Sequence, residues 1–225
     1  MAHLLHHEPW GVVDLDTSKR RVFVREDWQY SWDVEPGQPD WTHAEQLAFH
    51  KAVDRAVWAK WSERVRIQAR SSGFQKHPTT DRFKWEIAGV ALELSFDVRM
   101  VRSNGHWRVT VNKVDPQVKP KPRAEVINKS LEIILYSTDL LVTTARRSLD
   151  DPPNPGFSVH AHEFGHTMGP AGLVDEYKPE SAQYYDDRES IMNVGRQLRA
   201  RHLVHVCNAL GALVPGCSFI PLVTP

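Results

Sequence analysis

The sequence predicts an α+β fold in which a twisted mixed sheet is backed by one long helix and carries a second, shorter helix. Three patterns lead to this fold class. Apolar residues recur every four positions after Thr42, they alternate with other residues between Leu92 and Val111, and helical spacing returns after Ser158. Strands and helices therefore interleave along the chain, which is typical of a mixed domain with helices packed on a sheet.

The long helix is expected to begin after Thr42 and to run to about Arg70. Thr42 is followed three residues later by Glu45, which is the pattern of a capping box, and Ser-Ser-Gly follows Arg70. One face of this helix should be buried. It holds the residues that recur every four positions: Phe49, Val53, Val57, Trp61 and Val65.

Strand signals lie on both sides of this helix. Residues 21–32 are strand-like, and two alternating runs, 92–100 and 107–111, flank the dipeptide Asn104-Gly105, which predicts a β-hairpin. Three further elements are expected: a strand over residues 131–136, a loop over 150–156 and a helix over 158–168.

The length and composition of the chain limit its domain organisation and its partners. With 225 residues, 41% of them hydrophobic, it can bury a core without disulfides. We expect a single domain, with an N-terminal subdomain over 1–115 and a C-terminal subdomain over 124–225, separated by a Pro/Lys stretch. The 28 basic and 28 acidic residues cancel, which argues against nucleic acid or a membrane surface as a partner. The oligomeric state stays open.

The ends of the chain and its cysteines give further expectations. Residues 1–10 lack the basic start and apolar run of a signal peptide, so the protein is expected to be cytoplasmic or exported without a cleaved signal. The N-terminal histidines are expected to be disordered. Cys207 and Cys217 are too few for a disulfide framework, and whether they pair stays open.

The segment from His160 to Gly169 carries the chemistry. His162, Glu163 and His166 form the pattern His-Glu-x-x-His, and on a helix the two histidines lie one turn apart on the same face. Two imidazoles so placed can bind one zinc ion, and the neighbouring glutamate can act as general base toward a water molecule. The plainer alternative is a helix that carries two unrelated histidines.

Three downstream features favour the metal site. Gly169 can end the helix and let the chain turn back toward the metal, and Met192 lies in the sequence Ser-Ile-Met-Asn. The sequence Asp175-Glu176-Tyr177 offers a carboxylate as third ligand, and the shorter side chain directly after a turn favours Asp175 over Glu176. The other candidates for third ligand are Glu189 and His202.

The string from His162 to Gly169, with Met192, resembles the metzincin group of zinc peptidases, which have His-Glu-x-x-His-x-x-Gly and a methionine-bearing turn beneath the metal. The chain departs from that group at Gly172, where metzincins have their third ligand. The combination H-E-F-G-H, D-E-Y and S-I-M-N is similar to IgA-peptidase-like zinc peptidases and to bacterial toxin or effector peptidases. This resemblance covers residues 158–205 and implies a zincin fold, a Zn²⁺ cofactor and Asp175 as third ligand.

Several other residues are candidates for a supporting role. Met192 is expected beneath the metal, and Glu176 and His202 lie near the ligands in sequence. Tyrosines in this region could donate a hydrogen bond to an oxyanion, and arginines could hold a substrate carboxylate. The tyrosines are Tyr177, Tyr184 and Tyr185, and the arginines are Arg196, Arg199 and Arg201.

These observations lead us to expect a zinc metalloendopeptidase that hydrolyses peptide bonds in a protein or peptide substrate. A chain without a signal peptide suits an effector or toxin, with a secretion machine as partner. One alternative is a zinc- or partner-binding module without catalysis, in which the tryptophan-rich first half supplies an interaction surface. Another is an amidase that acts on cell-wall peptides.

Overall fold

The fold is known from a computed structural model, which describes residues 3–62, 64–71, 87, 89–117, 123–140, 143–145 and 154–223. Three α-helices lie in this part of the chain: α1 (His43–Trp61), α3 (Val159–Thr167) and α4 (Val204–Leu213). The short 3-10 helices are η1 (Ser137–Leu140), η2 (Pro179–Tyr184) and η3 (Ala200–Leu203). The strands are β1 (His3–Glu8), β2 (Gly11–Asp16), β3 (Arg21–Val34), β4 (Val65–Ser71), β5 (Ala91–Val101), β6 (Trp107–Lys113), β7 (Glu125–Ile127), β8 (Glu132–Tyr136), β9 (Thr143–Ala145), β10 (Asn154–Phe157) and β11 (Cys217–Val223).

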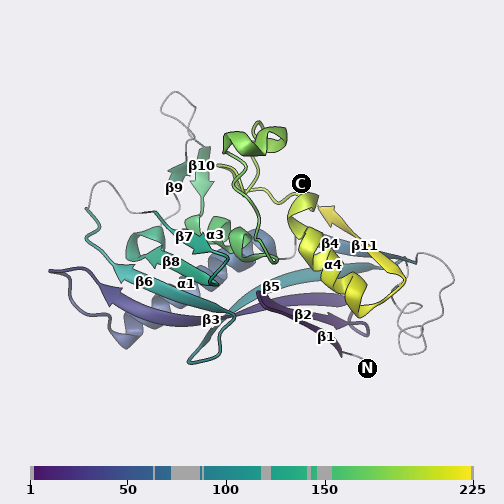
Figure 1. Ribbon diagram of the computed structural model, residues 1–225, viewed down its shortest axis with the longest axis horizontal. Helices are drawn as coiled ribbons and strands as arrows, with labels where there is room; N and C mark the ends of the chain where they lie inside the picture. Colours follow the sequence, from purple (N-terminus) through teal and green to yellow (C-terminus); the bar gives the residue numbers. More distant parts are fainter. Residues whose placement is uncertain are drawn as a thin grey trace.

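Nine of these strands form one twisted sheet in the order β11-β4-β5-β3-β6-β8-β7, to which β2 and then β1 are added beside β3 (Figure 1). Parallel pairs, β3 with β5 and β6 with β8, occur together with antiparallel ones such as β4 with β5. The α+β class and the twisted mixed sheet expected from the sequence are therefore confirmed. Strands from both expected subdomains belong to this one sheet.

The long strand β3 is the spine of the sheet, and its position makes the predicted hairpin wrong. β5 pairs in parallel with the first part of β3, and β6 pairs in parallel with its second part on the opposite edge. The chain between them crosses β3, and a Cβ on Gly105 would lie only 2.8 Å from the backbone nitrogen of Gln29. Asn104 does take the left-handed conformation of a turn residue, with φ of 54°. The alternation of apolar residues determines which face of a strand is buried, but it does not determine which strand pairs with it.

Helix α1 begins as predicted and ends earlier. Thr42 and Glu45 form both hydrogen bonds of the capping box, and the four-residue repeat is buried from Phe49 to Trp61. The predicted continuation to Arg70 is wrong, because β4 begins at Val65. Val65 fits the four-residue helical repeat by coincidence, whereas the buried positions in β4 recur every second residue.

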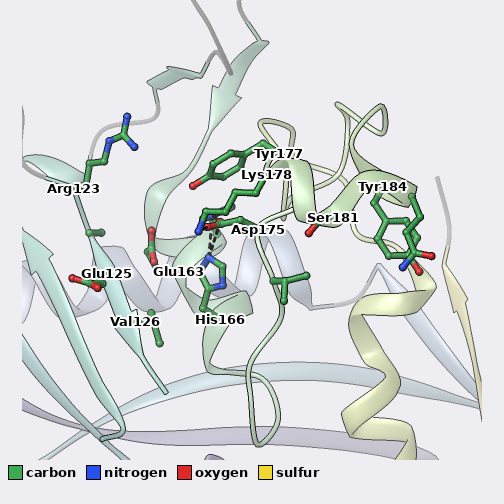
Figure 2. Close-up of a pocket in the computed structure, with 14 residues that line it drawn as sticks. Arg123, Glu125, Val126, Glu163, His166, Asp175, Tyr177, Lys178, Ser181 and Tyr184 are labelled. Atoms are coloured by element: carbon green, nitrogen blue, oxygen red, sulfur yellow. Dashed lines mark hydrogen bonds and ion pairs between the residues drawn. The ribbon is translucent and has the colours of Figure 1, made fainter. Parts of the chain in front are cut away.

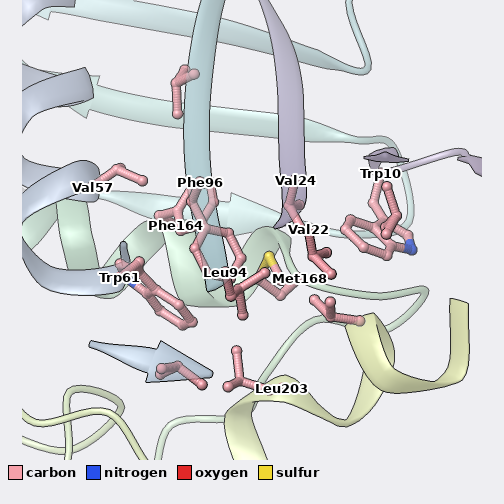
Figure 3. Packing of buried hydrophobic residues seen from close by; sticks show 14 of the residues in the cluster. Trp10, Val22, Val24, Val57, Trp61, Leu94, Phe96, Phe164, Met168 and Leu203 are labelled. Atoms are coloured by element: carbon pink, nitrogen blue, oxygen red, sulfur yellow. The ribbon is translucent and has the colours of Figure 1, made fainter. Parts of the chain in front are cut away.

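Four tryptophans from the first half of the chain are among the largest side chains of the buried core, and two of them, Trp10 and Trp61, are labelled in Figure 3. Trp61 of α1 packs edge-on against Phe96 of β5 and Phe164 of α3, and its Nε1–H donates to the backbone oxygen of Ala161 over 2.8 Å. This single side chain connects the long helix, the sheet and the helix that bears the histidines. The buried four are Trp10, Trp28, Trp61 and Trp107, so they are not part of a surface for partners.

Three smaller expectations are settled or left outside the described residues. The N-terminal histidines are ordered in β1, and part of the expected loop over 150–156 is strand β10; both expectations were wrong. Cys207 and Cys217 do not form a disulfide; the first is half-buried and the second buried. Most of the Pro/Lys stretch lies outside the described residues.

None of the described helices is long and apolar enough to cross a membrane.

Candidate metal centre

Helix α3 carries the His-Glu-x-x-His pattern and lies where the sequence predicts it. The Ser158 hydroxyl accepts from the backbone N–H of Ala161 at the start of the helix. The helix ends before Gly169, whose φ of +90° favours glycine, and a Cβ there would lie 2.2 Å from the His205 ring. Gly169 therefore ends the helix and turns the chain, as expected from the sequence.

The turn brings Asp175 back to the two histidines of α3 (Figure 2). The His162 and His166 Nε2 atoms are 3.2 Å apart, and Asp175 Oδ1 lies 3.1 Å from each of them. Among the described residues this is the one cluster of three such donors that could hold a metal ion. Of the candidates for third ligand, Asp175 is the one that the fold places beside the histidines.

Both imidazoles are held through their other ring nitrogen. His162 Nδ1 donates to the backbone oxygen of Ile191 over 2.7 Å, and His166 Nδ1 donates to the backbone oxygen of Leu173. A carbonyl oxygen can only accept, so each Nδ1 carries a hydrogen, and in the neutral ring each Nε2 then offers its lone pair to a metal ion. This arrangement is the one that a metal-binding histidine requires.

The carboxylate of Asp175 is surrounded by cationic and polar groups. Burial by itself would raise its pKa, but hydrogen bonds with His162 and His166 hold the pKa far below the ordinary range. Lys178 Nζ lies 2.6 Å from Oδ2, the oxygen that does not face the histidines. The ring of Tyr177 is stacked on that of His162, with centroids 6.2 Å apart. Asp175 is therefore an ionised carboxylate with one oxygen held by Lys178.

Glu163 lines the same cleft, beside the metal cluster (Figure 2). Glu163 is buried, with 8% of its surface exposed. Burial raises the pKa of this carboxyl, the charges of Asp175 and Glu125 raise it further, and the two histidines oppose the shift. A carboxylate with a raised pKa is a better proton acceptor than one in water, which suits a general base.

Met192 is buried and packs against α3 at Gly165. A Cβ on Gly165, in the middle of the His-Glu-x-x-His pattern, would lie 2.1 Å from the Met192 sulfur. Glycine at this position therefore lets the methionine segment approach the helix, and Ile191, the preceding residue, is the one that accepts from His162. The methionine acts on the site through packing.

Glu176 and His202, two alternatives for third ligand, belong to a separate buried cluster. Arg201 binds both carboxylate oxygens of Glu176 at 2.6 and 2.7 Å, and His202 Nε2 lies 3.2 Å from Oε1. These contacts lower the pKa of Glu176 to about 2, although burial alone would raise it. The third alternative, Glu189, is exposed and outside the metal cluster.

The metal cluster opens into a cleft of about 680 Å³. One wall is β7, which pairs with β8 alone among the described strands and so leaves its other edge unpaired. The opposite wall includes Lys178, Ser181 and Tyr184. Tyr184 stacks on the Arg201 guanidinium, 4.2 Å from its ring centroid, while Tyr185 and the three candidate arginines do not line the cleft.

A scan of protein-family models finds no match for the chain, and searches of curated proteins and of solved structures find none either.

Reasoning from the sequence missed several groups that support the centre. The two carbonyl acceptors of the histidines are backbone atoms and have no residue signature. Lys178 lies three residues after Asp175, and that spacing is a detectable signal once the ligand is known. Arg201 and the strand β7 could be assigned only from the fold, because their partners lie far away in sequence.

Proposed function

We propose that the protein is a zinc-dependent peptidase of the zincin type, with His162, His166 and Asp175 as ligands and Glu163 as general base. The observation that carries the proposal is the convergence of three ligand atoms beside an additional carboxylate in an open cleft. A structural zinc site takes four protein ligands, whereas a catalytic site takes three and leaves a position for water. Three donors and an adjacent base favour catalysis over a binding module.

The separations of the donors fit zinc. Zinc lies about 2.0 Å from a histidine nitrogen or a carboxylate oxygen, so two ligands of a tetrahedral site are about 3.3 Å apart. The three separations here are 3.1, 3.1 and 3.2 Å. Two histidines and one carboxylate are also a ligand set of known zinc hydrolases.

Each residue then has a defined role. A zinc ion held here would lower the pKa of a bound water and polarise the carbonyl of the scissile bond. Glu163 accepts the proton of the attacking water and returns it to the leaving amine. Tyr177 and Lys178 are polar groups beside Asp175 in the cleft, placed to donate to oxygen atoms of a substrate.

The unpaired edge of β7 favours an extended polypeptide as substrate. A peptide chain can add to such an edge through backbone hydrogen bonds, which bind many sequences alike. Ala124, Glu125 and Val126 line the cleft, so a strand added there would pass the metal cluster. This argument favours peptides and proteins over a compact small molecule.

The test combines metal content with cleavage. We expect about one zinc per chain, lost in His162→Ala and retained in Glu163→Gln, together with chelator-sensitive cleavage of unfolded protein that Glu163→Gln abolishes. Glu189→Gln changes an exposed carboxylate and is the matched control, with zinc and cleavage unaltered. A folded wild type that binds no zinc would refute the proposal.

Two further outcomes distinguish the alternatives. Cleavage of peptidoglycan fragments with none of proteins would show an amidase, and zinc that is bound without any hydrolysis would show a binding module. For an effector or toxin, we expect that wild type harms a target cell when it is expressed there and that Glu163→Gln does not. The Glu163→Gln variant keeps all three ligands, so the comparison isolates catalysis.

A further inference from the structure

A buried acidic side chain touches the end of the metal-binding helix from the opposite side. Glu26 of β3 is fully buried, and so are its two partners, Trp28 and Thr167. Trp28 Nε1–H donates to Oε2 over 2.9 Å, and Thr167 Oγ1 lies 2.7 Å from Oε1. Thr167 is the last residue of α3 and directly follows the ligand His166.

The hydroxyl of Thr167 has a second close oxygen neighbour. Its Oγ1 lies 2.6 Å from the backbone oxygen of Phe164, one turn earlier in α3. A threonine hydroxyl has one hydrogen, and a carbonyl oxygen can only accept. If that hydrogen points to Phe164, the contact with Glu26 requires a hydrogen on the carboxyl group. If it points to Glu26 instead, two oxygens stand 2.6 Å apart with no hydrogen between them.

The first arrangement also satisfies the end of the helix. The last carbonyl groups of an α-helix lack partners inside the helix. The backbone N–H of Met168, which would continue the pattern to Phe164, donates to Gly165 instead. The Thr167 hydroxyl therefore supplies the partner of the Phe164 carbonyl, and a protonated Glu26 supplies the partner of the hydroxyl. Every group in the chain then donates or accepts correctly.

The surroundings of Glu26 favour the neutral acid. Burial raises its pKa to about 8, and the hydrogen bonds with Trp28 and Thr167 only partly oppose this. From β2, Gly11 approaches with its backbone, since a Cβ there would lie 3.3 Å from the Glu26 side chain. Neither Trp28 of β3 nor Thr167 of α3 is charged, and no charged group contributes to the shift. The next acid in sequence, Asp27, pairs with Arg99 and Arg25, outside this cluster.

We propose that Glu26 is a positioning residue of the metal centre, acting as a neutral carboxylic acid that donates to Thr167 and so fixes the end of the helix beside His166. The role at the metal rests on the proposed function. When Glu26 ionises, it loses the hydrogen that it donates to Thr167. The last turn of α3 is then held less firmly. Zinc binding should then depend on a group that is not a ligand and does not touch one.

The protonation state is measured first, in metal-free protein. The ¹³C signal of the Glu26 carboxyl, assigned by its loss in Glu26→Gln, should be that of a neutral acid at pH 6 and should titrate near pH 8. A carboxylate signal at pH 6 would overturn the proposal. This measurement needs no metal, so it separates the state of Glu26 from the proposed function.

The role at the metal is measured by zinc affinity against pH. Glu26→Gln is the matched variant, because its amide can donate to Thr167 and accept from Trp28 but cannot ionise. With a pKa of about 8, about one tenth of the chains at pH 9 still have the neutral Glu26 that zinc binding requires. The zinc affinity of wild type relative to the variant should therefore fall about tenfold from pH 7 to pH 9.

Variants of the threonine supply the second test. Thr167→Ser keeps the hydroxyl and should behave as wild type, whereas Thr167→Val should weaken zinc binding and abolish the difference in pH dependence. An identical pH profile in wild type and Glu26→Gln would overturn the positioning role. Absence of zinc in every variant, with Glu26 protonated, would overturn the proposed function and with it the role at the metal.

Discussion

Replacing Glu176 with glutamine tests whether the cluster next to the ligands holds Asp175 in place. Glu176 directly follows that ligand, and its carboxylate accepts two hydrogen bonds from Arg201 and one from His202. Its backbone N–H donates to the oxygen of Met192 over 2.8 Å. The substitution keeps the size of the side chain and removes its charge. The new amide NH2 group then faces the N–H donors of Arg201 and His202.

The magnitude follows from the pKa of the carboxyl group. That pKa falls from 4.5 to about 2, and each unit corresponds to about 1.4 kcal/mol, so the contacts stabilise the ionised folded state by about 3 kcal/mol. Arg201 is a quarter exposed, which weakens the pairing by solvent screening. We therefore expect Glu176→Gln to lower the free energy of unfolding by about 2 kcal/mol and to weaken zinc binding about tenfold or more.

The assay is denaturant unfolding of the metal-free protein at several pH values, together with zinc affinity at pH 7. Because the pKa is lower in the folded state, the stability from Glu176 is present above pH 4.5 and is lost as the pH falls toward 2. The difference between wild type and variant should shrink over that range. Glu189→Gln, an exposed acid in the same region, is the control and should change stability by less than about 0.5 kcal/mol.

Two results would refute this reasoning. A variant as stable as wild type at pH 7 would show that the Glu176–Arg201 pair contributes nothing to folding. Complete loss of zinc with unchanged stability of the metal-free protein would show that Glu176 is itself a ligand, and Asp175 would then lose that role.

The remaining predictions concern packing and the helix ends. Gly165→Ala forces a Cβ to 2.1 Å from the Met192 sulfur, so we expect a loss of about 1–3 kcal/mol in chemical unfolding and weaker zinc binding; unchanged values would contradict the close approach. Thr42→Ala removes the capping hydroxyl, and thermal melting should show a loss of about 1 kcal/mol, with zinc affinity unaltered as the internal control. Trp61→Phe leaves the backbone oxygen of Ala161 without its 2.8 Å donor and should cost about 1–3 kcal/mol in the same assay; a neutral effect would mean that water or a shifted neighbour replaces the indole.

Much of the candidate ligand set could be predicted from the sequence because it is local. His162, Glu163 and His166 lie within one and a half turns of a helix, and the spacing of the histidines alone brings their side chains together. Asp175 lies nine positions after His166, and it was favoured over Glu176 because its shorter side chain comes directly after the turn that Gly169 begins. The positions of all four residues therefore follow from features that are close to them in sequence.

The rest depends on partners that are distant in sequence. The chain crosses β3 at Gly105 because β3 is long. Its pairing with β5 begins at Arg21, and its pairing with β6, on the other edge, begins seven residues later at Trp28. The end of α1 was misjudged because Val65 satisfies both the helical and the strand period. The protonated Glu26 is invisible in the sequence, because only its burial beneath α3 separates it from an ordinary surface acid of a strand.

The support of the metal centre has a consequence for the order in which the chain becomes competent. The residues that orient the ligands, Ile191 behind His162 and Arg201 behind the Asp175 loop, are made after the ligands themselves. A ribosome-bound chain that has emerged only as far as Asp175 has all its ligands and neither of these supports. Competence to bind metal should therefore arise late in synthesis, so that, for the proposed peptidase, a cell producing the protein would hold few partly finished chains able to cut its own proteins.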